Sequence, residues 1–201
     1  MPRHRVNWLR VFLISVPVAV TGALLAPYVL APFPSPVGSE EPSLLDGGPM
    51  RATPFLVPGI ERPATVAAQV AALADDDEVI GIVVNRRPRA YRLKAFSATY
   101  SHVVNDLIDT VPVTVTYCNV SDSIQAFTGP KRGDPLDIWT AGWNQQLILK
   151  TGHIAFSQQT GKMMDTERKD EMPFPIYPFE RVSWKAWRST YPGTDVYLGV
   201  N

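Results

Sequence analysis

Hydrophobic and polar positions divide the chain into three regions of different character. Residues 11–30 contain no charged residue, residues 31–63 are interrupted by proline, and residues 64–201 alternate between short apolar runs and turn residues. Twenty residues of helix rise about 30 Å, which is the thickness of the hydrocarbon core of a bilayer. The pattern therefore predicts a transmembrane helix over 11–30, a tether over 31–63 and a folded domain over 64–201.

The flank before the apolar run predicts the orientation of the chain. Residues 1–10 contain three arginines and no acidic residue, and basic flanks stay in the cytoplasm by the positive-inside rule. We therefore expect a cytoplasmic basic flank, a lipid bilayer as partner of residues 11–30, and an extracytoplasmic C-terminal domain. The alternative is a cleaved signal sequence and a secreted protein, although Pro27 directly after Ala26 makes a weak cleavage site.

The tether is predicted from its proline and glycine content. Residues 31–63 hold eight of the nineteen prolines and four glycines. Because proline fixes φ and lacks an N–H, this spacing predicts neither helix nor sheet. We expect a semi-extended spacer close to polyproline II, with a docking peptide for a proline-binding module as the alternative.

The domain over 64–201 is predicted to be α+β, with a β-rich, mostly antiparallel sheet and a few short helices. An alanine-rich helix is expected over 64–74, since the acidic run 75–78 opposes the dipole of a longer helix. That run is interpreted as a solvated turn, with a calcium site as the alternative. A hairpin is expected over 79–93, turning at 85–88. Further strands are expected over 113–118, 124–128, 136–139, 146–150, 153–156 and 196–198, and a short helix capped by Ser183 over 183–189.

Residues 172–179 carry a different pattern, in which three prolines alternate with large apolar side chains. This alternation predicts an extended strap over the core. A partner-binding surface is the alternative interpretation, because exposed apolar patches mark interaction sites.

Charge and motif content exclude several classes of function. The chain has 19 basic and 19 acidic residues, so it lacks the basic excess of a general nucleic-acid binder and no nucleic-acid partner is expected. A single cysteine excludes an intrachain disulfide framework and a zinc site built from several cysteines. Dinucleotide-binding and P-loop motifs and the H-E-x-x-H motif are absent, so neither a nucleotide nor a zinc-protease function has support.

Candidate chemistry centres on Cys118, His102 and Asp106. A thiolate and imidazoles are ligands of electron-transfer copper sites, and a histidine oriented by a carboxylate can activate a thiol. A metal or thiol-redox site holding copper, iron or zinc is therefore one hypothesis. Each residue also has a structural interpretation: a buried packing role for the cysteine, a hydrogen-bonded core role for the histidine, and a turn cap for Asn105 with Asp106.

Four stretches share an order and spacing that point to one family. They are Val79–Asn85 with Arg89–Leu93, His102–Asp106, Val111–Cys118, and Trp184–Arg188 with Tyr191–Val196. Together they resemble the "domain of unknown function 3179" family over about residues 76–199. The resemblance implies a bacterial protein, a family in which many members carry an export signal or membrane anchor, and no established biochemical activity.

The family pattern usually places a second cysteine a few residues after the first, and a histidine in or beside the segment matching Ser101–His102. Cys118 and His102 fit this pattern here, but Ser121 and Ser123 stand near the place of the second thiol. If the family's cysteines and histidine bind a metal or do redox work, this chain has lost one ligand. We therefore predict a membrane-tethered extracytoplasmic binding or structural module, with a degenerate metal or thiol-redox site as the alternative.

Overall fold

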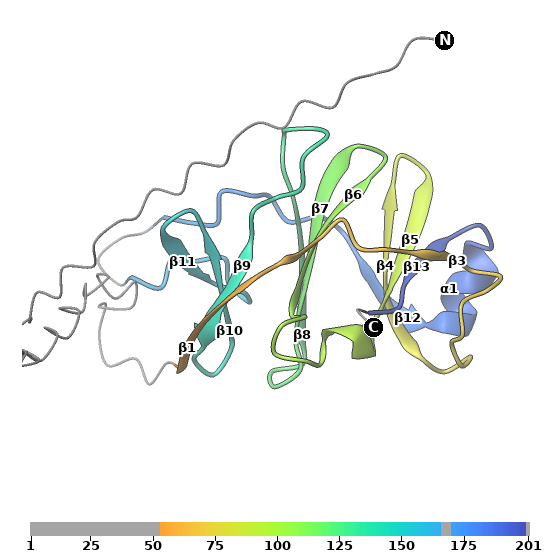
Figure 1. Ribbon diagram of the computed structural model, residues 1–201, viewed down its shortest axis with the longest axis horizontal. Helices are drawn as coiled ribbons and strands as arrows, with labels where there is room; N and C mark the ends of the chain where they lie inside the picture. The colour runs from red at the N-terminus through yellow and green to blue at the C-terminus, as the bar shows by residue number, and fades with distance from the viewer. Residues whose placement is uncertain (1–52, 166–169, 200–201) are drawn as a thin grey trace, which may run out of the picture. The chain divides into compact units, whose positions relative to one another are not determined.

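The computed structural model describes residues 53–165 and 170–199 of the chain, which form three β-sheets, one α-helix and one 3₁₀ helix (Figure 1). The predicted basic flank, the apolar run 11–30 and most of the predicted tether lie outside the described residues. Among the described residues, no helix has the length and apolar character needed to cross a bilayer.

The middle sheet has the order β2-β6-β7-β8. Its strands are β2 (Ile60–Glu61), β6 (Val103–Ile108), β7 (Val111–Cys118) and β8 (Ser123–Thr128). Strands β6, β7 and β8 pair antiparallel, and β2 runs parallel to β6. Asp109 and Thr110 both have positive φ between β6 and β7, which is the backbone of a tight two-residue hairpin.

The helix-bearing sheet has the order β12-β4-β5-β13-β3. Its strands are β3 (Val66–Ala67), β4 (Glu78–Val84), β5 (Arg87–Arg92), β12 (Glu180–Ser183) and β13 (Asp195–Tyr197). Helix α1 (Trp184–Thr190) covers its outer face and buries Trp184 and Trp187 there. A Cβ on Gly81 of β4 would lie 2.2 Å from Trp187, so this position needs glycine to admit the indole.

The N-terminal sheet has the order β1-β9-β10-β11, and all of its pairs are antiparallel. Its strands are β1 (Thr53–Pro58), β9 (Trp139–Trp143), β10 (Leu147–Thr151) and β11 (Ile154–Ser157). The middle sheet lies between the other two sheets (Figure 1). One apolar cluster joins it to the helix-bearing sheet through residues such as Ile80 and Val115, and a second joins it to the N-terminal sheet through residues such as Val103 and Leu149.

The 3₁₀ helix η1 (Leu93–Phe96) follows β5 and packs Leu93 and Phe96 into the first of these clusters. Phe96 contacts Tyr117 and Tyr197 edge to face, with ring centroids 6.5 and 6.3 Å away. These aromatic contacts fix the position of the turn that follows β5.

The β-rich, mostly antiparallel architecture with a short α-helix agrees with the predicted fold class. The hairpin β4–β5 turns at Asn85 and Arg86, which both have positive φ. The strands expected over 113–118, 124–128, 146–150, 153–156 and 196–198 are present within a residue or two. Ser183 caps α1 as expected, accepting from the N–H of Ala186.

The prediction that no sheet forms in the proline-rich stretch is wrong for residues 53–61, which form β1 and β2. Strand β1 lies at the edge of its sheet and pairs with β9 alone. An edge strand tolerates Pro54 and Pro58 because a missing N–H there interrupts no ladder on the open side. These two strands form because they pair with distant strands, and the local composition carries no information about that pairing.

The helix expected over 64–74 is also wrong. This segment forms the two-residue strand β3 and then turns. Val66 pairs with Val196, and the N–H of Ala68 donates to the carbonyl of Thr194 at 3.0 Å. An eleven-residue helix is marginal in water, whereas the sheet edge offers both hydrogen bonds and burial of Ala68 against α1.

Two further segments differ in detail from the expectation. The strand expected over 136–139 begins only at Trp139, and Leu136 and Ile138 before it are buried in the cluster shared with the N-terminal sheet. The strap over 172–179 is extended as predicted: the N–H of Tyr177 donates to the carbonyl of Ala126 at 2.8 Å. The chain then continues into β12, which the sequence patterns did not indicate.

Candidate functional site

The structure places Asp106 and Cys118 on opposite faces of the middle sheet. Asp106 pairs with Val113 and points toward the helix-bearing sheet, where it meets Tyr91. Cys118 is buried in the cluster shared with the N-terminal sheet, beside Phe127. Since side chains alternate between the two faces of a strand, the sheet itself separates this carboxylate from this thiol. Across residues 53–165 and 170–199, no group of three or more His, Cys, Asp or Glu side chains is arranged to hold a metal ion.

His102 is a buried residue that joins backbone segments. Its Nδ1 lies 3.0 Å from the carbonyl oxygen of Tyr117, and the N–H of Tyr117 donates to the carbonyl of His102 at 3.1 Å. Burial lowers the pKa of His102, because it disfavours the imidazolium more than the backbone hydrogen bonds of Tyr117 and Phe96 favour it. The geometry gives this imidazole a structural contact between β7 and η1.

Asp106 is the centre of a buried polar network rather than a turn cap, so the expectation for it is wrong. It lies inside β6, and its Oδ2 accepts from Arg89 Nη1 and from the hydroxyl of Tyr91, both at 2.7 Å. Its Oδ1 accepts from the N–H of Leu107 at 2.6 Å. The pKa of Tyr91 is raised well above its usual value, mainly by burial and next by the negative charge of Asp106. The phenol therefore stays protonated and donates to the carboxylate.

Asn105 points to the other face of β6 and has an equally fixed role. Its Nδ2 donates to the carbonyl of Ile138 at 2.9 Å, and its Oδ1 accepts from the hydroxyl of Thr114 at 2.7 Å. A Cβ on Gly59 would lie 2.3 Å from the same Nδ2. The amide thus ties β6 and β7 to the segment before β9, close beside the β1–β2 connection, and it is no turn cap either.

The two serines near the expected second thiol also form a polar network. Ser123 is the partner of Cys118 in the β7–β8 register. Its hydroxyl lies 2.8 Å from that of Ser121 and donates to Oε1 of the buried Gln158 at 2.6 Å. Gln158 also donates to Thr116. These contacts tie the end of the β7–β8 hairpin to the segment after β11.

The accessible polar groups gather elsewhere, in two adjoining pockets on either side of η1. One pocket has a volume of about 350 Å³ and is lined by three consecutive acidic residues from 76 to 78 and by Tyr117. The other has a volume of about 410 Å³ and is lined by Arg92, Tyr100 and the chain end at 198–199. Lys94 and Ser97 line both.

Asp77 fixes the wall between the two pockets. It is buried and accepts from the N–H of Ala74 at 3.1 Å, from Arg92 Nη2 at 3.3 Å and from Lys94 Nζ at 3.2 Å. Burial opposes its ionisation, but the hydrogen bonds of Ala74 and Lys94 and the charges of Arg92 and Lys94 outweigh burial, so its pKa is lowered. The acidic run is therefore not a purely solvated turn: one of its carboxylates organises the neighbouring cations.

Apart from the acidic run, sequence patterns did not single out the residues of these pockets. Arg92 and Lys94 stand in an ordinary alternation of polar and apolar positions at the end of a strand. Their counterion comes from a turn before β4, and the opposite wall comes from the C-terminal end of the chain. No local motif marks a site assembled from segments this far apart.

These features define a mostly antiparallel, three-sheet β protein in which the chemistry-bearing residues of the middle sheet hold the layers together. A family model described as "Protein of unknown function (DUF3179)" matches residues 56–198, and the chain belongs to this family. The predicted resemblance is confirmed, and the match begins earlier than predicted, within β1. No curated protein and no solved structure matches the chain.

Proposed function

We propose that the chain is a membrane-tethered extracytoplasmic module that binds a ligand without transforming it. The location rests on the sequence: a charge-free run of transmembrane length follows a basic flank. The binding role rests on the surface around η1. The two parts of the proposal depend on different residues and are tested separately.

The pair of pockets that share Lys94 and Ser97 carries the binding role. Their volumes, about 350 and 410 Å³, lie at the lower end of the range typical of small-molecule sites. Lys94 has 75% of its side chain exposed, so its ammonium group is accessible to a ligand. Polar groups that converge on a concave surface fix the orientation of a ligand without any bond being made or broken.

The buried candidates for chemistry have structural partners instead. His102 bonds backbone, Asp106 is held by Arg89 and Tyr91, and Cys118 packs among apolar side chains. A nucleophile and its base need to lie within hydrogen-bond reach of each other. Nδ1 of His102, the expected base, is paired with the carbonyl of Tyr117. Asp106, the expected orienting carboxylate, lies on the opposite face of the sheet from Cys118. This geometry favours the binding role over the metal or thiol-redox alternative.

A topology experiment tests the tether. A reporter enzyme that is active only outside the cytoplasm is fused at Asn201, and a matched control carries the same reporter directly after Arg10. We expect activity only in the first fusion, and full-length chain in the membrane fraction after alkaline washing. An inactive reporter in a full-length Asn201 fusion, or a chain that washes out at full length, contradicts the tether. A shortened soluble product outside the cytoplasm identifies the cleaved signal sequence.

A metal and thiol analysis tests the binding role against the alternative. The full-length protein is purified in detergent, because a fragment starting at residue 64 would lack β1 and β2. We expect no stoichiometric copper, iron or zinc, and a thiol that reacts only after unfolding. One equivalent of metal, lost in both Cys118→Ser and His102→Ala, would overturn the proposal in favour of a metal site.

A further inference from the structure

The pocket on the far side of η1 has an unusual charge pattern for its size. Arg92 and Lys94 line it together with Ser97, Tyr100 and Ser101, and within residues 53–165 and 170–199 no aspartate or glutamate lines it. The hydroxyl of Ser101 already donates to the carbonyl of Ala98, so the donors that remain for a ligand belong to the two cations and to Ser97 and Tyr100. The pocket is matched to a ligand that accepts hydrogen bonds and carries negative charge.

The charges around this pocket do not cancel. Asp77 is the counterion of both cations, at 3.3 Å from Arg92 and 3.2 Å from Lys94. One carboxylate therefore faces two positive groups. Asp77 lines the acidic pocket but not the cavity of about 410 Å³, whereas both cations line that cavity, so its described lining is net positive.

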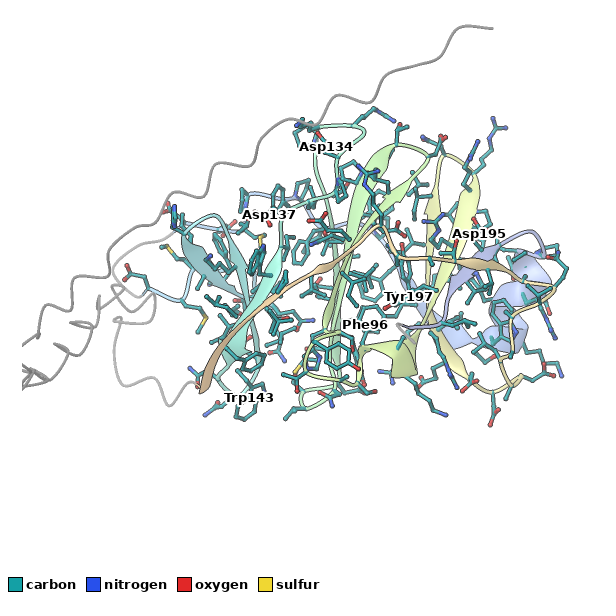
Figure 2. All side chains as sticks on the ribbon, viewed as in Figure 1. Phe96, Asp134, Asp137, Trp143, Asp195 and Tyr197 are labelled. Carbon is teal, nitrogen blue, oxygen red and sulfur yellow. The ribbon has the colours of Figure 1, made fainter. Side chains whose placement is uncertain are left out.

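Two buried donors at or next to this pocket have no partner. Among the described residues, Nε of Arg92 and the hydroxyl of Tyr197 are buried polar atoms without a hydrogen bond. Tyr197 directly precedes the two chain-end residues that line the cavity, and packs against Phe96 of η1 (Figure 2). A buried donor left unpaired is costly, so the region around the pocket holds hydrogen-bonding capacity that the described side chains do not use.

We propose that this pocket binds the oxyanion group of a ligand, with Arg92 and Lys94 as the charged donors and Ser97 and Tyr100 as neutral ones. The inference rests on the proposed binding role and names the chemistry of its ligand. Arginine and lysine are the side chains that recognise phosphate and carboxylate groups. The cavity is larger than one such group, so the remainder of the ligand has room beside Ala95 and Leu198.

Titration with inorganic phosphate tests the proposal. The full-length protein in detergent is titrated with sodium phosphate by calorimetry, with sodium chloride added to hold the ionic strength constant. We expect saturable binding that weakens about tenfold in Lys94→Gln, because a charge-assisted hydrogen bond contributes that much. Lys131→Gln is the matched control: this lysine is also exposed and paired with an aspartate, Asp134, but lies outside the pocket.

Arg92→Gln is the second variant, and its thermal unfolding is measured first because Arg92 is partly buried. We expect it to weaken phosphate binding at least as much as Lys94→Gln does. Absence of saturable binding, or equal affinity in the wild type, Lys94→Gln and Lys131→Gln, would overturn the proposal. Since Lys94 is mostly exposed, its variant keeps the test valid if Arg92→Gln does not fold.

A competition arm separates a free ligand from a lipid headgroup. The phosphate titration is repeated in micelles doped with phosphatidylglycerol, and in micelles doped with phosphatidylcholine as the control. Competition by phosphatidylglycerol alone assigns the oxyanion to a lipid, and unchanged phosphate binding assigns it to a soluble ligand. If the reporter at Asn201 is active but phosphate does not bind, the ligand chemistry alone is overturned. If phosphate binds but the reporter at Asn201 is inactive, the tether alone is overturned.

Discussion

Replacing Asp106 by asparagine tests the idea that the buried polar network holds the middle and helix-bearing sheets together. The change keeps the shape of the side chain and removes its charge. Asp106 has 3% and Arg89 16% of their side chains exposed, so water cannot restore the lost partner. The remaining carboxylate near Arg89 is that of Asp195, at 3.4 Å and half exposed.

The expected cost follows from this geometry. Removing one partner of a buried ion pair typically costs 3–5 kcal/mol, and the residual contact with Asp195 places this variant near the lower end, at about 3 kcal/mol. Tyr91→Phe removes one hydrogen bond to the same carboxylate and leaves the ion pair intact. Its expected cost is smaller, about 1.5 kcal/mol.

Urea unfolding of the full-length protein in detergent, followed by tryptophan fluorescence, measures these differences, since Trp184 and Trp187 are fully buried. A double-mutant cycle compares Arg89→Met, Asp106→Leu and the variant that carries both changes. We expect the double variant to lose much less than the sum of these two single changes, because an apolar pair leaves no uncompensated charge. An unfolding free energy of Asp106→Asn within about 1 kcal/mol of the wild type, or strict additivity in the cycle, would refute the reasoning.

Three further changes test other parts of the fold. Gly81→Ala brings a Cβ to 2.2 Å from Trp187, so we expect thermal unfolding to show a free energy of unfolding lowered by about 3 kcal/mol. Gly193→Ala is the control: it has open space around its Cβ and should unfold much like the wild type. Because the folded-state pKa of His102 lies below its ordinary 6.5, the contribution of the neutral imidazole to stability is present above that value and is lost as the pH falls. Unfolding curves from pH 7.5 to 5 should therefore show a decline in stability that is weaker in His102→Gln. Identical pH profiles of the two proteins would contradict this prediction. Ser183→Ala removes the cap of α1 and should cost about 1 kcal/mol, and an unchanged midpoint of urea unfolding would show that the cap contributes nothing.

Local patterns predicted several strands whose neighbours in sequence are also their neighbours in space, although they missed β6, which forms a tight hairpin with β7. The hairpins β4–β5 and β7–β8 follow from β-branched runs separated by short polar turns. Helix α1 follows from its serine cap and its two inward-facing tryptophans. In each case the element is stabilised by contacts between residues close together in the sequence, so the structure that the local pattern favours is the one found in the folded protein.

Segments that pair with distant strands were predicted poorly. Strand β1 pairs with β9 and β3 with β13, and β12 joins β4 at a separation of about a hundred residues. Proline content argued against β1 and alanine content argued for a helix at β3, yet both segments complete the open edge of a sheet. Hydrogen bonds to a distant strand outweigh propensities that differ by a fraction of a kcal/mol per residue.

The amino-acid sequence alone determined the family, the β-rich class and the presence of a charge-free run long enough to span a bilayer, because these depend on residue type and spacing along the chain. It also named Cys118, His102 and Asp106 as residues able to do chemistry. Only the tertiary structure decided that Cys118 and Asp106 face opposite sides of the middle sheet, and that Arg92 and Lys94 share one carboxylate beside a cavity. A side chain's function depends on its neighbours in space, and here those neighbours come from strands and turns that fold together from distant parts of the chain.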